Sequence, residues 1–156
     1  MVCQAKVLMI GDSVTEGVSD TLREHFPNAT IDGAVSRQFD QGVQILRDDL
    51  ARGMDPQVIV FALGTNGPVS EQMAQQVIDL AGGRPLYFAT TRAPVDWVPG
   101  NNATFIGMAE RNPNVGIIDW SGTSQGRDDY LYDDGIHPNQ LGMQAYLQMF
   151  LNAFCA

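Results

Sequence analysis

The chain has 156 residues and a formal net charge of −9 at pH 7, with one lysine and eight arginines. This length suits one domain that buries a sizeable core without a metal or a disulfide. The charge argues against nucleic acid as a main partner, because such binding relies on clustered basic side chains. No apolar run approaches the roughly 20 residues that a membrane-spanning helix needs.

Short apolar runs alternate with longer amphipathic stretches along the whole chain. In chain order, the pattern predicts a strand at 6–10, a helix at 15–26, a strand at 29–32, a helix at 41–53, a strand at 58–63, a helix at 70–81, a strand at 86–89, a helix at 102–111, a strand at 115–119 and a helix at 139–154. This alternation indicates an α/β fold, in which a parallel sheet is covered on both faces. Functional groups are then expected beyond the carboxyl ends of the strands.

The first motif of chemical interest is Gly-Asp-Ser at 11–13, between the first strand and the first helix. The hydroxyl of Ser13 would lie in the crevice at the sheet edge. Its own amide would stand at a helix N-terminus, where a developing negative charge is stabilised. Taken alone the motif is weak, and the alternative is that Ser13 only caps the helix.

The second motif is Asp-Gly-Ile-His-Pro at 134–138, in a loop before the last helix. Histidine is the usual base for a serine nucleophile, and a carboxylate fixes its tautomer. Asp134, three residues before His137, can lie on the same side of a tight loop. One alternative is a polar loop that caps the last helix. Another is a metal site of Asp133, Asp134 and His137, which ranks lower because it lacks a second histidine or a cysteine at ligand spacing.

The third motif is Gly-Thr-Asn-Gly at 64–67, directly after the third strand. The side-chain amide of Asn66 can donate a hydrogen bond to an oxyanion, and loss of one such donor typically costs about 3 kcal/mol of transition-state stabilisation. A glycine-rich turn is the alternative for this motif alone. All three motifs fall at the same predicted edge of the sheet, and together they indicate a serine-nucleophile enzyme.

In this order the three motifs resemble those of the SGNH (GDSL-type) hydrolase superfamily, and the resemblance extends along essentially the whole chain. It implies a flavodoxin-like three-layer α/β/α sandwich around a five-stranded parallel sheet, without metal or organic cofactor. It also implies that Ser13 is the nucleophile, His137 the base, Asp134 the acid that orients it, and Asn66 the oxyanion asparagine.

The family's second block departs from its pattern in this chain. Members usually supply a glycine whose amide joins the oxyanion hole, and within residues 32–38 that position aligns with Ser36. A backbone amide donates whatever the side chain, so Ser36 can still serve, with Gly33 as the fallback. The expected oxyanion hole therefore consists of the Ser13 and Ser36 amides and the Asn66 side chain.

Further details resemble the extracytoplasmic catalytic domain of bacterial peptidoglycan O-acetyltransferases: Val-Ser-Arg-Gln at 35–38, Gly-Thr-Asn-Gly at 64–67, and Asp119-Trp120 after the fifth strand. The resemblance implies acetyl transfer, through acetyl-Ser13, to the C6 hydroxyl of N-acetylmuramic acid. It also implies that residues 1–156 are one catalytic domain, monomeric when isolated and excised from a longer protein. The membrane-embedded acyltransferase portion of that protein would deliver the acetyl group to the outer side of a bacterial membrane.

Two other functions remain open at this point. An acetyl-esterase of the same superfamily would carry the same catalytic residues and remove acetyl groups from carbohydrate. A catalytically inactive glycan-binding module would have lost at least one of Ser13, Asn66, Asp134 and His137, and all four are present.

Three side chains are candidates for contact with substrate. Trp97 follows the fourth strand and Tyr132 precedes the second motif, so either could stack on a sugar ring, with packing against the rim as the alternative. Arg37, beside the oxyanion position, could contact an anionic muramoyl or peptide carboxylate, and a structural salt bridge is its alternative.

The two cysteines, Cys3 and Cys155, lie at opposite ends of the chain. They could be unrelated thiols. They could also form a disulfide, because a first strand and an antiparallel last helix would bring both sulfurs to the same edge of the domain. Such a bond would indicate an oxidising compartment.

Overall fold

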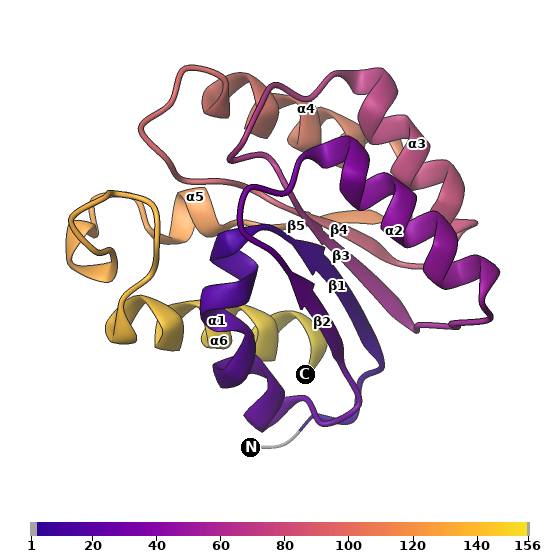
Figure 1. The fold of residues 1–156 in the computed structure, drawn as a ribbon, viewed down its shortest axis with the longest axis horizontal. Helices are drawn as coiled ribbons and strands as arrows, with labels where there is room; N and C mark the ends of the chain where they lie inside the picture. The colour runs from indigo at the N-terminus through magenta and orange to yellow at the C-terminus, as the bar shows by residue number, and fades with distance from the viewer. Residues whose placement is uncertain (1–2, 156) are drawn as a thin grey trace.

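A five-stranded parallel sheet forms the centre of the protein, in a computed structural model that describes residues 3–155 (Figure 1). Its strands are β1 (Val7–Gly11), β2 (Thr30–Gly33), β3 (Val58–Ala62), β4 (Leu86–Ala89) and β5 (Val115–Ile118). They lie in the order β2-β1-β3-β4-β5, and every neighbouring pair is parallel. The carboxyl ends of all five strands therefore meet at one edge of the sheet.

Helices cover both faces of the sheet, so the expected three-layer α/β/α sandwich is confirmed (Figure 1). On one face lie α1 (Ser13–His25) and α6 (Gln140–Phe154), and on the other lie α2 (Phe39–Ala51), α3 (Glu71–Ala81) and α4 (Val98–Arg111). Two short elements, α5 (Trp120–Thr123) and the 3₁₀ helix η1 (Asp128–Tyr130), follow β5. Within residues 3–155, no helix is both long and apolar enough to cross a membrane.

The side chains of β1, β3, β4 and β5 alternate between two apolar clusters, one on each face. Leu8 and Ile10 of β1 pack with the cluster under α2, α3 and α4, whereas Val7 and Met9 pack with the cluster under α1 and α6. Because both faces are buried, the strands appear in the sequence as continuous apolar runs. A fully buried leucine or phenylalanine contributes roughly 1.5–3 kcal/mol relative to an exposed one, so these two clusters hold the layers together.

The structure extends several helices beyond the predicted limits. Helix α4 starts at Val98 rather than at 102, with a proline in its first turn, and α2 starts at Phe39 rather than at 41. Proline is well tolerated at the start of a helix because its missing N–H would have no helical partner there. The short helices α5 and η1 were not predicted, since four and three residues are too few to show a helical period.

Two glycines let α1 approach the sheet closely. A Cβ atom on Gly33 would lie 2.4 Å from the backbone nitrogen of Glu16 and 2.9 Å from the carbonyl oxygen of Asp12. A Cβ atom on Gly11 would lie 1.8 Å from the Thr15 hydroxyl oxygen. These contacts press the first turn of α1 against the ends of β1 and β2, so the position of the turn that carries Ser13 is fixed by backbone packing.

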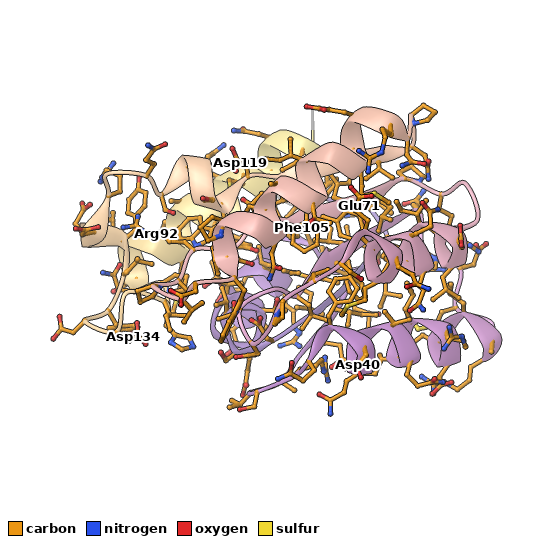
Figure 2. All side chains as sticks on the ribbon, turned by 90° about the horizontal axis from the view of Figure 1, so that it is seen from above. Asp40, Glu71, Arg92, Phe105, Asp119 and Asp134 are labelled. Carbon is orange, nitrogen blue, oxygen red and sulfur yellow. A yellow bond between two sulfur atoms is a disulfide. The ribbon has the colours of Figure 1, made fainter. Side chains whose placement is uncertain are left out.

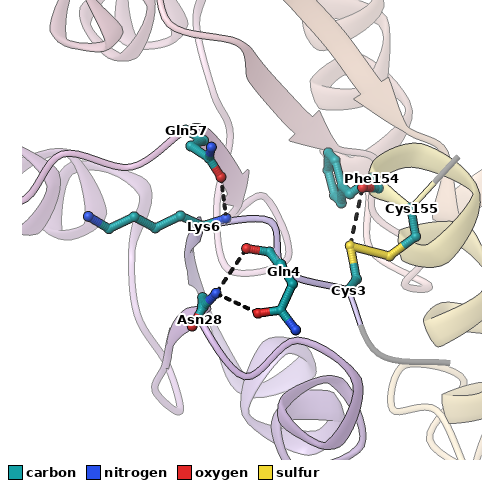
Figure 3. The surroundings of a disulfide bond; sticks show 7 residues. All are labelled: Cys3, Gln4, Lys6, Asn28, Gln57, Phe154 and Cys155. Atoms are coloured by element: carbon teal, nitrogen blue, oxygen red, sulfur yellow. Dashed lines mark hydrogen bonds between the residues drawn. A yellow bond between two sulfur atoms is a disulfide. The ribbon is translucent and has the colours of Figure 1, made fainter.

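A disulfide bond joins Cys3, just before β1, to Cys155, just after α6 (Figure 3). The two Cα atoms are 5.6 Å apart, within the usual range for a disulfide. The Cys3 sulfur also lies 3.2 Å from the carbonyl oxygen of Phe154. This is a close contact and not a hydrogen bond, because a disulfide sulfur has no proton to donate. The bond closes almost the whole chain into a loop.

We expect reduction of the disulfide to lower the free energy of unfolding by about 2–5 kcal/mol, because the reduced chain gains loop entropy when it unfolds. The measurement is urea unfolding with and without reductant. The double variant Cys3→Ala/Cys155→Ala is the control, and its stability should not respond to reductant. Two free thiols in the untreated protein would contradict the bond.

Candidate active site

The turn that carries Ser13 is organised by its neighbour Asp12, whose side chain is buried. Asp12 is the N-cap of α1, and its carboxylate accepts a hydrogen bond of 3.0 Å from the amide of Val14. Burial raises the pKa of Asp12, and hydrogen bonds from Val14 and Thr65 oppose that shift. Because Asp12 caps the helix, Ser13 is not its N-cap, which was the alternative role considered for Ser13. Ser13 becomes the first residue of α1.

Three side chains form a hydrogen-bonded row at the carboxyl edge of the sheet. The hydroxyl of Ser13 lies 2.8 Å from Nε2 of His137, and Nδ1 of the same ring lies 2.5 Å from Oδ2 of Asp134. The other oxygen of Asp134 accepts bonds from the backbone amides of Ile136 (2.8 Å) and His137 (3.0 Å). The hydrogen bond with the His137 side chain, followed by the one with its amide, lowers the pKa of Asp134 to about 2. The sequence motifs predict that these three side chains lie close together, and the structure places them within hydrogen-bond distance of one another in a row.

The loop that holds Asp134 and His137 is a narrow hairpin. Leu131 and Pro138 form an antiparallel bridge, and the amide of Tyr132 donates a bond of 2.9 Å to the carbonyl of His137. Gly135 sits at the tip with a φ of +70°, a conformation that glycine adopts at no steric cost. In Figure 2, Asp134 lies with Arg92 toward the end of the molecule where the loops gather.

Contacts from α6 and η1 fix the base of this hairpin. The side chain of Asn139 caps α6 by accepting from the Gly142 amide (3.0 Å) and also donates to the carbonyl of Asp129 (2.7 Å). A Cβ atom on Gly142 would lie 2.1 Å from the Tyr130 carbonyl oxygen, so only glycine allows this close packing. The ring of Tyr130 stacks on Trp120, with centroids 6.1 Å apart.

Asn66 lies in the loop after β3, and its amide nitrogen donates to the carbonyl of Arg37 at 3.2 Å. The loop is held by the buried side chain of Asn101 in α4. That side chain donates to the carbonyls of Gly64 (2.9 Å) and Gly67 (2.8 Å) and accepts from the amide of Val69 (2.7 Å). Sequence reasoning missed Asn101, because its position appeared to precede the helix. The sequence signal that could have identified Asn101 is a polar residue at the helical spacing of the buried apolar positions of α4.

Ser36 is the one non-glycine residue with a positive φ (+62°) among residues 3–155. A left-handed conformation costs an ordinary residue roughly 1–2 kcal/mol, and glycine adopts it freely. The position that aligned with a family glycine thus has the backbone conformation that favours glycine. The fallback residue, Gly33, lies within β2 and faces the first turn of α1.

The three candidate substrate contacts differ in exposure. Trp97 is 36% exposed, and its ring nitrogen donates to the carbonyl of Thr65 (2.9 Å), next to Asn66. Tyr132 is exposed on the hairpin. The guanidinium of Arg37 is mostly buried and donates to the carbonyls of Gly11 and Asp32 and to the Asp32 carboxylate, so the salt-bridge alternative is present.

Comparisons of the sequence and the fold with those of known proteins identify similar proteins. No protein-family model matches the chain. Peptidoglycan O-acetyltransferase OatA of Listeria monocytogenes is 33% identical over 144 residues, and putative peptidoglycan O-acetyltransferase YrhL of Bacillus subtilis is 30% identical over 148. These alignments cover 92% and 95% of the chain but 23% of each relative. The chain thus spans about a quarter of the length of the curated relatives it matches.

Solved structures with the same fold include the C-terminal catalytic domain of Streptococcus pneumoniae OatA, bearing a methylsulfonyl adduct. The TM-score is 0.86 at 20% identity, over 97% of this chain and 93% of that one. A member of the lipolytic G-D-S-L family from Veillonella parvula gives a TM-score of 0.81 at 18% identity, over 96% and 97%. The chain is a homologue of OatA, and it shares the fold of the lipolytic G-D-S-L family.

In this OatA homologue the metal-site alternative gains no support. Among the residues that the structure describes, no group of three histidine, cysteine, aspartate or glutamate side chains could hold a metal ion. Both carboxylate oxygens of Asp134 are occupied by hydrogen bonds from within the hairpin.

The low pKa of Asp134 predicts a specific pH dependence in the OatA homologue. Its folded-state pKa of about 2 lies below the ordinary value of 3.8, so its contribution to stability is complete above about pH 4. That contribution is lost as the pH falls through 2. We expect the Asp134 carboxyl carbon to show no titration above about pH 3 by NMR.

The variant His137→Ala is the control for this titration. It removes the largest cause of the shift, so the Asp134 midpoint should rise toward 3.8. A midpoint near 4 in the unmodified protein would contradict the hydrogen-bonded pair.

Proposed function

We propose that this chain is the catalytic domain of a serine O-acetyltransferase that acetylates a hydroxyl of cell-wall glycan through an acetyl-Ser13 intermediate. The observation that carries the proposal is the hydrogen-bonded row of Ser13, His137 and Asp134 in a chain 30–33% identical to OatA-type relatives over more than nine-tenths of its length. Such a row activates a serine hydroxyl for attack on a carbonyl.

In the first step, Nε2 of His137 takes the proton of the Ser13 hydroxyl as the serine oxygen bonds to the acetyl carbonyl carbon. The bond between the acetyl group and the donor's oxygen then breaks, and His137 returns the proton to that oxygen. Asp134 holds the ring of His137 in the required orientation and stabilises its charged form. Acetyl-Ser13 remains on the protein.

In the second step, the acceptor's hydroxyl attacks acetyl-Ser13. His137 takes the hydroxyl proton while the new ester bond forms, and then returns it to the Ser13 oxygen as the serine ester breaks. The proposed acceptor is the C6 hydroxyl of N-acetylmuramic acid in peptidoglycan. The choice of peptidoglycan rests on the names of the relatives, a peptidoglycan O-acetyltransferase and a putative one. The choice of the C6 hydroxyl rests on the family resemblance of the sequence.

The oxyanion of each tetrahedral intermediate is proposed to bind three donors: the amides of Ser13 and Ser36 and the side chain of Asn66. Ser13 stands at the first position of α1, where backbone N–H groups have no partner within the helix. The carboxylate of Asp12 takes the Val14 amide instead. The positive φ of Ser36 supports its alignment with the family glycine. The Asn66 nitrogen carries two hydrogens, and its bond to the Arg37 carbonyl uses one of them.

The acceptor is proposed to lie across the rim formed by Trp97 and Tyr132. Both rings are at least 36% exposed, and aromatic rings pack well against the apolar faces of sugars. Trp97 is fixed beside the Asn66 loop by its bond to Thr65. Arg37 is proposed to support the site, because three of its five N–H donors bond to Gly11 and Asp32 at the sheet edge.

The chain is further proposed to be one domain of a longer protein, on the outer side of a bacterial membrane. It matches about a quarter of the length of its relatives, which leaves room for a membrane-embedded portion that supplies acetyl groups. The disulfide supports an oxidising location, since such bonds are rare in the cytosol.

The second candidate, a carbohydrate acetyl-esterase, is less favoured, because the relatives are named as O-acetyltransferases. Its support is the fold shared with a family 3 carbohydrate esterase of Clostridium thermocellum (TM-score 0.74, 16% identity). Water would then attack acetyl-Ser13 in place of a sugar hydroxyl.

The deciding experiment incubates the protein with 4-nitrophenyl acetate and an oligosaccharide containing N-acetylmuramic acid, followed by mass spectrometry. We expect the glycan to gain acetyl groups, and Ser13→Ala to abolish the gain. Free acetate alone, dependent on Ser13, would identify an esterase. Equal product from Ser13→Ala would overturn both enzymatic functions.

The role of Asn66 predicts a loss of kcat of about 10²–10³-fold in Asn66→Ala, because one oxyanion donor is removed. Asn66→Asp should be no better, since a carboxylate accepts hydrogen bonds and repels the oxyanion. The exposed Asn152 of α6 provides the matched control Asn152→Ala. Esterase kinetics with 4-nitrophenyl acetate measure all three variants, and unchanged kcat in Asn66→Ala would remove Asn66 from the oxyanion hole.

A further inference from the structure

A small, partly enclosed cavity lies next to the turn that carries Ser13. Its lining comes from the first turn of α1, the loops after β3 and β4, α5 and α6, and includes Asp12, Thr15, Thr65, Trp120 and Tyr146. About 20 Å³ of this cavity is open to the centre of a water molecule. One water needs roughly 10–15 Å³ on this measure, so the cavity holds one molecule of that size.

Two residues of the cavity lining carry a buried polar atom with no hydrogen-bond partner among the described residues: the Thr15 hydroxyl oxygen and the Trp120 ring nitrogen. Both side chains are at most 2% exposed, so bulk water does not reach them. A buried polar group without a partner is strongly unfavourable, and native proteins rarely retain one. Two such atoms on one cavity indicate a shared ligand.

The lining defines the chemistry of that ligand. The indole N–H of Trp120 only donates, so the ligand must accept a hydrogen bond, which excludes a metal cation or an ammonium ion. The buried Asp12 carboxyl in the lining disfavours an anion. The lining's one arginine, Arg92, is already paired with the Ser124 carbonyl and the Asp128 carboxylate. A hydroxyl group such as that of Thr15 can either donate or accept. A neutral molecule that both donates and accepts, and that fits the measured space, is water.

We propose that one ordered water occupies this cavity, bound to the Thr15 hydroxyl and the Trp120 indole, and that it holds the Ser13 turn in register with the His137 hairpin. Thr15 lies two residues after Ser13 in the first turn of α1. On the other side, Trp120 stacks on Tyr130, whose backbone carbonyl accepts from the amide of Asn139 at the base of the hairpin. The water thus links the elements that carry the two partners of the 2.8 Å bond between Ser13 and His137.

Two consequences of this water are separable. Its binding is independent of the function proposed above. Its effect on catalysis rests on that function, and it makes Thr15 and Trp120 positioning residues that touch no substrate.

NMR tests the binding directly, because the chain has two tryptophans and hence two indole N–H signals. Trp97→Phe assigns them. We expect a water-to-indole dipolar cross peak at Trp120, with the sign of a water that stays bound for longer than about a nanosecond. Thr15→Val should abolish the peak and Thr15→Ser should retain it. A Trp120 signal with no cross peak in the unmodified protein would overturn the proposal.

The stability of Thr15→Val gives a second test through its sign. Valine has nearly the shape of threonine without the hydroxyl, so it isolates the hydrogen bond. If the hydroxyl binds the water, Tm should fall by about 2–4 °C, on the scale expected for a domain of this size. If the hydroxyl has no partner, valine removes a buried polar group and Tm should rise, which would overturn the proposal.

Kinetics test the positioning role. Thr15→Val should lower kcat with 4-nitrophenyl acetate on the order of tenfold while KM stays within about twofold, because reacting groups tolerate little displacement. Thr15→Ser should recover most of kcat. A Thr15→Val variant that loses the cross peak and keeps full kcat would overturn the positioning role. An unmodified protein that shows the cross peak without esterase activity would contradict the proposed function and leave the bound water supported.

Discussion

The hydrogen bond between Ser13 and His137 joins residues 124 positions apart, and most of the local structure at the carboxyl edge of the sheet bears on it. On the Ser13 side, Gly11 and Gly33 allow α1 to press against the strand ends. On the His137 side, the hairpin is held by Asn139 and by close packing against Tyr130. Each partner is therefore placed by backbone contacts, which tolerate much less movement than flexible side chains. This geometry exists without a bound substrate, as the proposed acyl transfer requires.

Much of the fold could be predicted from the sequence because burial on both faces leaves a plain signal. The runs in β1 and β3 are apolar at nearly every position, and the predicted strand ranges agree with the structure within about two residues, the usual uncertainty of element ends. The side chains of Ser13, Asp134 and His137 could also be grouped, because parallel strands bring their carboxyl ends together. That these side chains lie close together follows from the parallel topology of the sheet, which the alternation of strands and helices indicates.

The supporting residues could not be predicted, because their roles depend on tertiary contacts. Asn101 lies in line with the buried positions Val98, Phe105 and Met108 of α4, yet the residues before 102 contain proline and glycine and resembled a loop. In the sequence, Asp12 was interpreted only as part of the Gly-Asp-Ser motif. In the structure it caps α1, so the Ser13 hydroxyl is not needed as the cap. The cavity next to that turn is formed by α1, α5, α6 and two loops, so no local pattern could indicate it.

The exposure of the site bears on the choice between transfer and hydrolysis. The side chains of His137 and Asp134 are 36% and 43% exposed, so solvent reaches the proposed base. Because the site is open to water, exclusion of water cannot make it prefer a sugar hydroxyl as the attacking group. Water is also present at a far higher concentration than the acceptor. In the proposed transfer, the acceptor must therefore be favoured by binding that holds its hydroxyl near acetyl-Ser13, where effective concentrations can far exceed that of water. In this chain two exposed aromatic side chains are candidates for that binding: Trp97, bonded to Thr65 next to Asn66, and Tyr132 on the hairpin that carries His137. Under the proposed function, acceptor contacts with these two side chains, more than the hydrogen-bonded row itself, should determine how much acetyl reaches a glycan.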